Sequence, residues 1–142
     1  MSIQYRNEYV KKWSERAAEI RFRLDRVDAL HCDGYTTEAT PGMEPGIPIE
    51  IKATKRFVEN GSDAPLRPGR WHLTLSSHDR LVDEDGYYCL IVYSIVEHGG
   101  GDRLLIEDLR LISASSISPL INTDASVYRL DRTALNGNEG IL

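Results

Sequence analysis

The sequence predicts an α/β (α+β) fold, in which helices flank a mixed central β-sheet. Three patterns support this prediction. Apolar residues recur at steps of three and four near the N-terminus, alternate with polar residues over positions 46–54, and occupy both parities of positions 87–96. These patterns are typical of an amphipathic helix, of a strand with one buried face and of a strand covered on both faces.

The first element is predicted to be a helix that ends around residues 23–26. The stripe that it is expected to bury consists of Tyr9, Trp13, Ala17, Ile20 and Leu24. On the same helical wheel Glu19 lies at the flank of this stripe, whereas Glu15 points roughly opposite. Glu19 is therefore the acid expected to lie nearer the sheet.

Extended chain is expected to follow this helix. Residues 27–32 (VDALHC) have the composition of a strand, and Asp33-Gly34 is a turn or bulge signal. Residues 35–40 are expected to continue the strand. The segment 41–46 (PGMEPG) is rich in turn residues and delivers the chain into the next strand.

That next strand is the alternating segment 46–54, GIPIEIKAT. Successive side chains of a strand point to opposite faces, so Glu50 and Lys52 should project side by side from one face. The polar segment 55–69 then predicts a long loop, and loops of this length are frequently functional or mobile.

The rest of the chain predicts further strands and short helices. The expected elements are a strand over 70–75, a short helix capped by Ser76 with Asp79 three residues on, a strand over 87–96, a glycine-rich hairpin turn, a strand over 103–113, a helical turn over 116–121 and an edge strand over 127–135. Together they predict a single domain over residues 1–142, with a core at about 8–113 and a C-terminal extension over 114–142.

Composition predicts an ordinary soluble, cytoplasmic protein. The 142 residues are 41% hydrophobic and 27% charged, without an apolar run near the length of a membrane span or a signal peptide. Cys32 and Cys89 are expected to be buried, reduced thiols. A net charge of −5 argues against non-specific coating of nucleic acid, although a local basic patch is compatible with it.

The acidic residues of the predicted strands suggest chemistry. Asp28 shares its parity with Leu30 and Cys32, so it should be partly buried, and a buried carboxylate needs a partner. Neighbouring strands could place Asp28 and Glu50 within reach of a divalent cation, with Lys52 beside them. Magnesium takes oxygen ligands and keeps several waters, so one or two protein carboxylates suffice. Such a cation and a lysine together suit hydrolysis of a phosphodiester.

The order of these elements resembles the PD-(D/E)xK nuclease superfamily, which has the restriction-endonuclease-like fold. The resemblance covers roughly residues 8–96: the first helix, VDAL, a hairpin turn, PIEIKAT, GRWHLTLSSHDRLV and YYCLIVYSI. It implies a magnesium-dependent DNA endonuclease, a phosphodiester hydrolase in which Mn²⁺ can substitute for Mg²⁺. It also implies a possible homodimer, since such enzymes often dimerise to cut both strands.

The resemblance assigns roles to particular residues. Glu50-Ile51-Lys52 matches the (D/E)xK element, and Lys52 would orient or activate the attacking water. Asp28 is the preferred first acid because it lies inside a predicted strand, although Val27-Asp28 lacks the family's proline. Asp28 and Glu50 would then bind the metal.

The first acid and the helper glutamate each have an alternative residue. Asp33 is nearer in sequence to the Glu-x-Lys element and can replace Asp28 as the first acid. Many members of the superfamily carry a helper Glu on the first helix, and Glu19 matches that place better than Glu15.

Basic residues gather around the candidate site. Those in or beside the long loop, where contact with nucleic-acid phosphates is predicted, are Lys55, Arg56, Arg67 and Arg70; Lys11 and Lys12 lie on the helix.

Two alternative functions fit the same residues. The first is a catalytically inactive nuclease-like module that binds nucleic acid or protein, and the second is an interaction domain whose Glu50–Lys52 face is merely solvated. No cysteine or histidine spacing typical of a zinc site is present, nor a phosphate-binding loop of the P-loop type.

Overall fold

The structure is a computed structural model, and it describes residues 3–27, 32–58, 67–122 and 128–131. A five-stranded sheet of order β1-β2-β3-β7-β8 forms its centre. The strands of this sheet are β1 (Asp25–Arg26), β2 (Gly34–Tyr35), β3 (Pro48–Lys55), β7 (Tyr87–His98) and β8 (Gly101–Ser113). β3 and β7 are parallel and the other pairs are antiparallel, so the predicted mixed sheet is confirmed.

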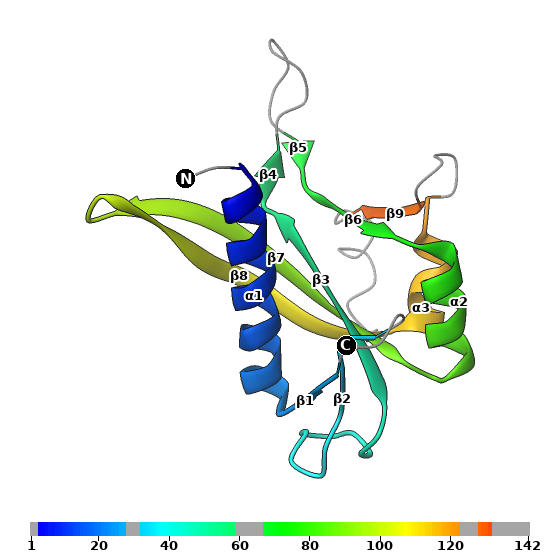
Figure 1. Ribbon diagram of the computed structural model, residues 1–142. Coiled ribbons are helices and arrows are strands. Elements are labelled where there is room, and N and C mark those ends of the chain that lie inside the picture. Colours follow the sequence, from blue (N-terminus) through cyan, green and yellow to red (C-terminus); the bar gives the residue numbers. More distant parts are fainter. Residues whose placement is uncertain (1–2, 28–31, 59–66, 123–127, 132–142) are drawn as a thin grey trace.

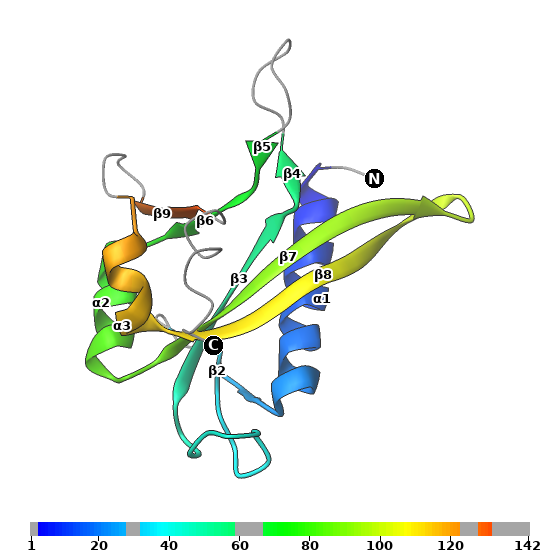
Figure 2. The same cartoon turned by 180° about the vertical axis from the view of Figure 1, so that it is seen from behind.

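Helices and two small ribbons surround the sheet (Figures 1 and 2). The helices are α1 (Ile3–Phe22), α2 (Leu75–Asp83) and α3 (Ala114–Ile117), followed by the 3-10 turn η1 (Ser118–Leu120). The ribbons are β4 (Phe57–Val58) with β5 (Arg67–Pro68), and β6 (Arg70–Leu73) with β9 (Tyr128–Asp131). The first helix and, from residue 46 on, the predicted strands and helices are thus present in the predicted order. However, α2 has Thr74 and not Ser76 at its N-cap, and the long loop begins and ends in paired backbone.

The two faces of the sheet pack against different elements. Alternate residues of β3 and β7, such as Ile49 and Cys89, face α1, and the intervening ones, such as Tyr88 and Leu90, face α2, α3 and the β6–β9 ribbon. β7 is buried on both parities as its sequence predicts, and both cysteines are buried free thiols.

The buried face of α1 differs from the prediction. The side chains that pack toward the sheet are Val10, Ser14 and Ala18, whereas Trp13 is 46% exposed and Ile20 is 59% exposed. Small side chains at positions 14 and 18 allow the helix backbone to approach the sheet closely, so the larger residues one position earlier are excluded from the contact.

The chain between β2 and β3 also differs from the prediction. The strand ends at Tyr35, and residues 36–40 form a turn instead of continuing it. The Thr36 hydroxyl donates to the Glu44 carbonyl oxygen at 2.7 Å and accepts from the Ile47 N–H at 2.8 Å. The Thr36 backbone still pairs with residues 46 and 47, and the turn is closed by the Thr40 N–H, which donates to the Thr37 carbonyl oxygen at 3.0 Å, and by the Thr37 N–H, which donates to the Thr40 hydroxyl at 2.9 Å. Most of the strand predicted over 27–32 lies outside the described residues.

β8 forms one edge of the sheet and is irregular in its middle. The pairing Val92 with Asp108 is followed by Tyr93 with Ile106, so Glu107 is an extra, bulged residue. The Asp108 carboxylate accepts a hydrogen bond from the Leu109 N–H at 2.9 Å.

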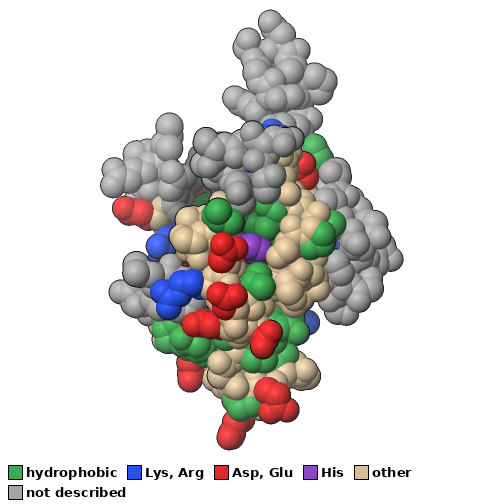
Figure 3. Space-filling view, turned by 90° about the vertical axis from the view of Figure 1, so that its right-hand side faces the viewer, with side chains coloured by type: hydrophobic (Ala, Val, Ile, Leu, Met, Phe, Trp, Pro, Cys, Tyr) green, Lys and Arg blue, Asp and Glu red, His purple; other side chains and the backbone are tan. Residues whose placement is uncertain are grey.

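The face around α2 is acidic. The exposed side chains of Asp79, Asp83, Glu84 and Asp85 lie in α2 and the turn after it, and Figure 3 shows acidic groups gathered on this side of the molecule. A polyanion would be repelled by this acidic surface. Within the described ranges, no helix has both the length and the apolarity needed to cross a membrane.

Candidate active site

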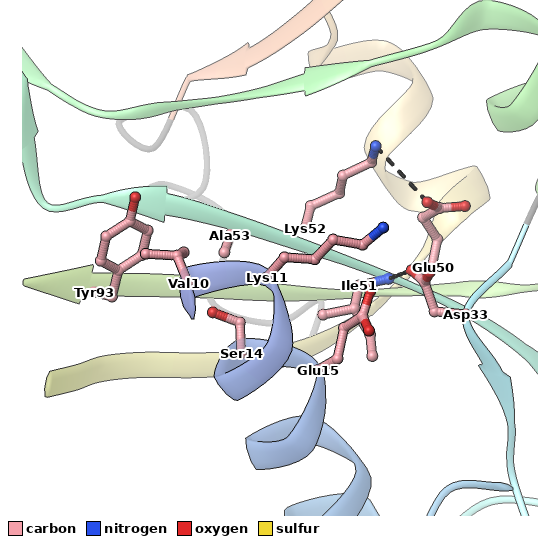
Figure 4. Close-up of a pocket in the computed structure, with 10 residues that line it drawn as sticks. All are labelled: Val10, Lys11, Ser14, Glu15, Asp33, Glu50, Ile51, Lys52, Ala53 and Tyr93. Atoms are coloured by element: carbon pink, nitrogen blue, oxygen red, sulfur yellow. Dashed lines mark hydrogen bonds and ion pairs between the residues drawn. The ribbon is translucent and has the colours of Figure 1, made fainter. Parts of the chain in front are cut away.

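A cavity of about 420 Å³ lies between α1 and β3 (Figure 4). It exists because β2 pairs only with Pro48 and Ile49, so β2 does not cover β3 beyond this point. The charged side chains that line the cavity are Lys11, Glu15, Asp33, Glu50 and Lys52. Two helix residues, one residue beside β2 and two residues of β3 therefore converge on one space.

Glu50 and Lys52 lie side by side on β3, as the alternation of the strand predicts. The Lys52 Nζ is 3.7 Å from the Glu50 Oε1, with the two side chains 30% and 16% exposed. Tyr88 and Leu90 of the parallel strand β7 lie opposite them in the register. The pair is therefore held on a central part of the sheet, and it is not a freely solvated cross-strand pair.

Asp33 enters the cavity by completing the hydrogen bonds of β3. Its N–H donates to the Ile49 carbonyl oxygen at 2.8 Å, and its carboxylate accepts from the Ile51 N–H at 2.7 Å. The carboxylate thus serves as the partner of β3 just where β2 ends. The next residue must be glycine, because a Cβ on Gly34 would lie 2.8 Å from the Asp25 carbonyl oxygen.

Glu15 approaches the same cavity from α1. Its side chain is 16% exposed, and the Arg26 guanidinium lies 3.9 Å away. Burial raises the pKa of the Glu15 carboxyl, and repulsion from Asp33 raises it further. Glu19 lies one turn along the helix and lines a separate hollow of about 170 Å³ together with Trp13.

The cavity holds three acidic side chains, those of Glu15, Asp33 and Glu50, in a partly buried space. Burial raises the pKa of Glu50 to about 7; repulsion from Asp33 and Glu15 contributes to the rise, and Lys52 opposes it. A divalent cation would relieve this repulsion, and carboxylate oxygens are the donors that Mg²⁺ prefers. Among the described residues no three acidic, His or Cys side chains are already gathered as metal ligands. Asp33 and Glu50 nevertheless present two carboxylates to the cavity, a donor set that fits a magnesium ion completed by water or substrate.

The other residues predicted for the site lie in different places. Asp28 falls outside the described residues. Lys55 and Arg56 are exposed beyond the end of the cavity, and Arg56 is paired with Glu107 at 3.0 Å. Arg70 lies on the β6–β9 ribbon, 3.9 Å from an Asp131 oxygen.

Arg67 belongs to the short strand β5. Lys55, Arg56 and Arg70, whose side chains are described, do not line the cavity, whereas Lys11 does.

Several lining residues carry no sequence pattern that marks them. Ser14 and Tyr93 become recognisable only when α1 and β7 are placed against β3, whereas Lys11 is one of the basic residues expected around the site. Glu15 and Asp33 were the less favoured alternatives, and the fold brings both to Glu50 and Lys52.

In a comparison with protein families, a model described as a PD-(D/E)XK nuclease superfamily domain matches residues 3–132. Comparisons with curated proteins and with solved structures gave no match.

Proposed function

We propose that this chain, which belongs to the PD-(D/E)XK nuclease superfamily, is a metal-dependent endonuclease that hydrolyses phosphodiester bonds of DNA. The observation that supports the proposal best is the meeting of Glu15, Asp33, Glu50 and Lys52 in one cavity. Glu50 and Lys52 occupy the (D/E)xK positions, and the two other acids come from separate elements of the fold.

Asp33 and Glu50 are the proposed metal ligands, with Glu15 as helper. A bound Mg²⁺, or Mn²⁺ in its place, would polarise the phosphoryl oxygen and lower the pKa of a bound water. The backbone fixes Asp33 by two hydrogen bonds, from its N–H to Ile49 and from the Ile51 N–H to its carboxylate. The central strand fixes Glu50, so both carboxylates are oriented before substrate arrives.

Lys52 supplies the positive charge that the reaction requires. Its ammonium group lies within 4 Å of Glu50 and remains partly exposed to the cavity. It can therefore hold the attacking water and stabilise the negative charge that develops on the phosphoryl oxygens. The exposed Lys55, at the end of β3, extends this positive charge toward a DNA backbone.

Cleavage of plasmid DNA and of short branched DNA, in Mg²⁺ or Mn²⁺ against EDTA, tests the proposal. Glu50→Gln and Lys52→Met should each lower the cleavage rate at least about 100-fold. Glu97→Gln makes the same chemical change on an exposed part of β7 and should keep the wild-type rate. Wild-type cleavage by either site variant would overturn the assignment.

The same assay decides between the alternative acids. We expect Asp33→Asn and Glu15→Gln to lower the cleavage rate strongly. Asp28→Asn and Glu19→Gln should leave most of the rate intact. If Asp28→Asn instead lowered the cleavage rate strongly and Asp33→Asn did not, Asp28 would be the first metal ligand.

A binding module without catalysis is the second candidate function, and the lack of a preassembled ligand group among the described residues favours it. Titration with Mn²⁺, followed by calorimetry, separates the two candidates. An enzyme should bind the metal and lose that binding in Glu50→Gln, whereas an inactive module should bind none. Sedimentation of the protein with and without DNA would test the homodimer that the resemblance to the superfamily implies.

A further inference from the structure

The cavity extends well beyond the carboxylates. Ala53, which also lines it, lies three residues after Glu50 on β3, a distance of about 10 Å along a strand. Figure 4 shows Val10, Ser14 and Tyr93 at one end and the carboxylates of Glu50 and Asp33 at the other. The far end has no part in the proposed metal chemistry.

Ser14 is an unusual residue at this far end. Its side chain is 1% exposed, and its hydroxyl makes no hydrogen bond with any described residue. A serine in a helix commonly bonds to the carbonyl one turn earlier, and a buried hydroxyl without a partner is destabilising. The hydroxyl borders the cavity, so a polar atom of a ligand can become its missing partner.

Lys11 connects the two ends. It lies one helical turn, about 6 Å, from Glu15, and its side chain extends along the cavity toward Glu50 and Lys52 (Figure 4). Burial raises the pKa of Glu15, and the positive charge of Lys11 partly opposes this rise. A phosphate next to the one held at the carboxylates would meet this ammonium group.

The polarity of the cavity thus changes in a fixed order. Acids and Lys52 occupy one end, Lys11 the middle, and the apolar Val10, the Ser14 hydroxyl and the Tyr93 ring the other. A nucleotide has the same order of phosphate, sugar and base. A volume of about 420 Å³ is near the lower end of ordinary ligand cavities. It suits one nucleotide better than a base pair.

We propose that this far end is a subsite for one unpaired nucleotide adjoining the scissile phosphate. Lys11 binds the phosphate of that nucleotide, Ser14 bonds to its sugar or base, and Val10 and Tyr93 contact the base. The inference rests on the proposed nuclease function and specifies its substrate as DNA with an unpaired residue at the cut, such as a single strand or a flap.

Binding without cleavage tests this subsite. Fluorescein-labelled dT8 and a blunt hairpin duplex are titrated into the Glu50→Gln protein in EDTA, and anisotropy reports the affinity. We expect tighter binding of dT8. Lys11→Met should weaken dT8 binding about tenfold and reduce the slope of log K against log salt by about 0.7.

Two further variants separate the subsite from general effects. Lys12→Met removes the same charge from the same helix, but Lys12 lies over the Trp13 ring at 5.4 Å and does not line the cavity. It should affect dT8 and duplex alike. Ser14→Ala should weaken dT8 binding several-fold while its Tm stays equal to that of the parent or rises, because it removes an unsatisfied hydroxyl.

The outcomes distinguish the two proposals. Equal affinity for dT8 and duplex, or unchanged dT8 binding in both Lys11→Met and Ser14→Ala, would overturn the subsite. If the wild-type protein still cuts DNA with Mg²⁺ in that case, the proposed nuclease function stands alone. Failure of the protein to bind or cut any nucleic acid would overturn both.

Discussion

The two long sides of the sheet are covered by helices that pack in different ways. α2 buries large groups, among them Leu81 at 0% exposure and His78 at 4%. α1 instead buries Ser14 and Ala18 and leaves Trp13 largely outside. Large side chains fill the space on the α2 side, whereas small ones on the α1 side leave a cavity next to β3.

The buried polar groups on the two sides also differ in how many of their hydrogen bonds are made. Both ring nitrogens of His78 have partners, the Tyr88 hydroxyl at 2.8 Å and the Ser118 hydroxyl at 2.9 Å. On the α1 side Ser14 has no partner among the described residues, and Glu50, on the edge of β3 that β2 leaves uncovered, carries a strongly raised pKa. The comparison teaches that the groups around His78 satisfy one another, whereas Ser14 and Glu50 border the cavity with interactions that a ligand could complete.

Truncation on the α2 side should have the largest effect. Leu81→Ala should lower the free energy of unfolding by about 2–5 kcal/mol, because it leaves a cavity in the main core. Urea unfolding followed by circular dichroism measures this value. Leu75→Ala, at a residue of the same helix that is 46% exposed, is the control and should cost far less. Equal losses in the two variants would contradict this description of the core.

Enlargement on the α1 side should have the next largest effect. Ala18→Leu adds volume where the helix lies close to the sheet, so unfolding should become easier by about 1–3 kcal/mol. The variant should also lose metal affinity, since Glu15 moves away with the helix. Ala39→Leu, at an exposed position, should change neither property. Tolerance of leucine at position 18 would show that close packing does not set the position of α1.

The raised pKa of Glu50 predicts a pH dependence in metal-free protein. Its folded pKa of about 7 lies above the ordinary value of 4.5, so the folded state binds the extra proton between these values. The contribution of Glu50 to stability is therefore fully present below pH 4.5 and is lost as the pH rises through 7.

Glu50→Gln should consequently be more stable than wild type at pH 8, by on the order of 1–2 kcal/mol after solvent screening is allowed for. The two proteins should match near pH 4. Thermal unfolding in EDTA across this range is the measurement. A constant difference at every pH would mean that the carboxyl is not perturbed.

The smallest effect is expected at Trp13. Trp13→Ala should change stability by no more than about 0.5 kcal/mol, because the ring contributes little to the core. Trp71, which is 3% exposed and donates to the Ile91 carbonyl oxygen at 3.1 Å, is the internal reference. Acrylamide should quench roughly half of the tryptophan fluorescence of the wild type and very little in Trp13→Ala.

The sequence predicted the fold well where one pattern dominates. The alternation around Glu50 and Lys52 defined β3, and an apolar run on both parities defined the central strand β7. Burial on one or two faces of a sheet produces these patterns directly, so no knowledge of neighbouring elements was needed.

The face of α1 could not be predicted in this way. The stripe with the largest apolar residues includes Trp13, but the helix buries Ser14 and Ala18, one position later. A shift of one residue rotates a helix by about 100°. That rotation turns the buried face toward Glu15, which lines the cavity, whereas Glu19 lines only the neighbouring hollow that Glu15 also borders. Close approach to the sheet, and not total hydrophobicity, decided the face.

Asp33 illustrates a second limit of sequence patterns. An Asp-Gly pair is typical of a turn, and its carboxylate commonly bonds to nearby backbone. Here the carboxylate bonds instead to Ile51, eighteen residues away, because β2 ends before that residue. Only the pairing of the strands reveals this role.

The bulge in β8 has a consequence for the behaviour of the protein at high concentration. A thirteen-residue strand at the edge of a sheet can act as a template for strands of other molecules. In β8 the extra residue Glu107 interrupts the regular ladder, and Asp108 already holds the Leu109 N–H. An incoming strand would have to displace this carboxylate and bring its own backbone against charged side chains. The edge is therefore protected from fibre-like growth.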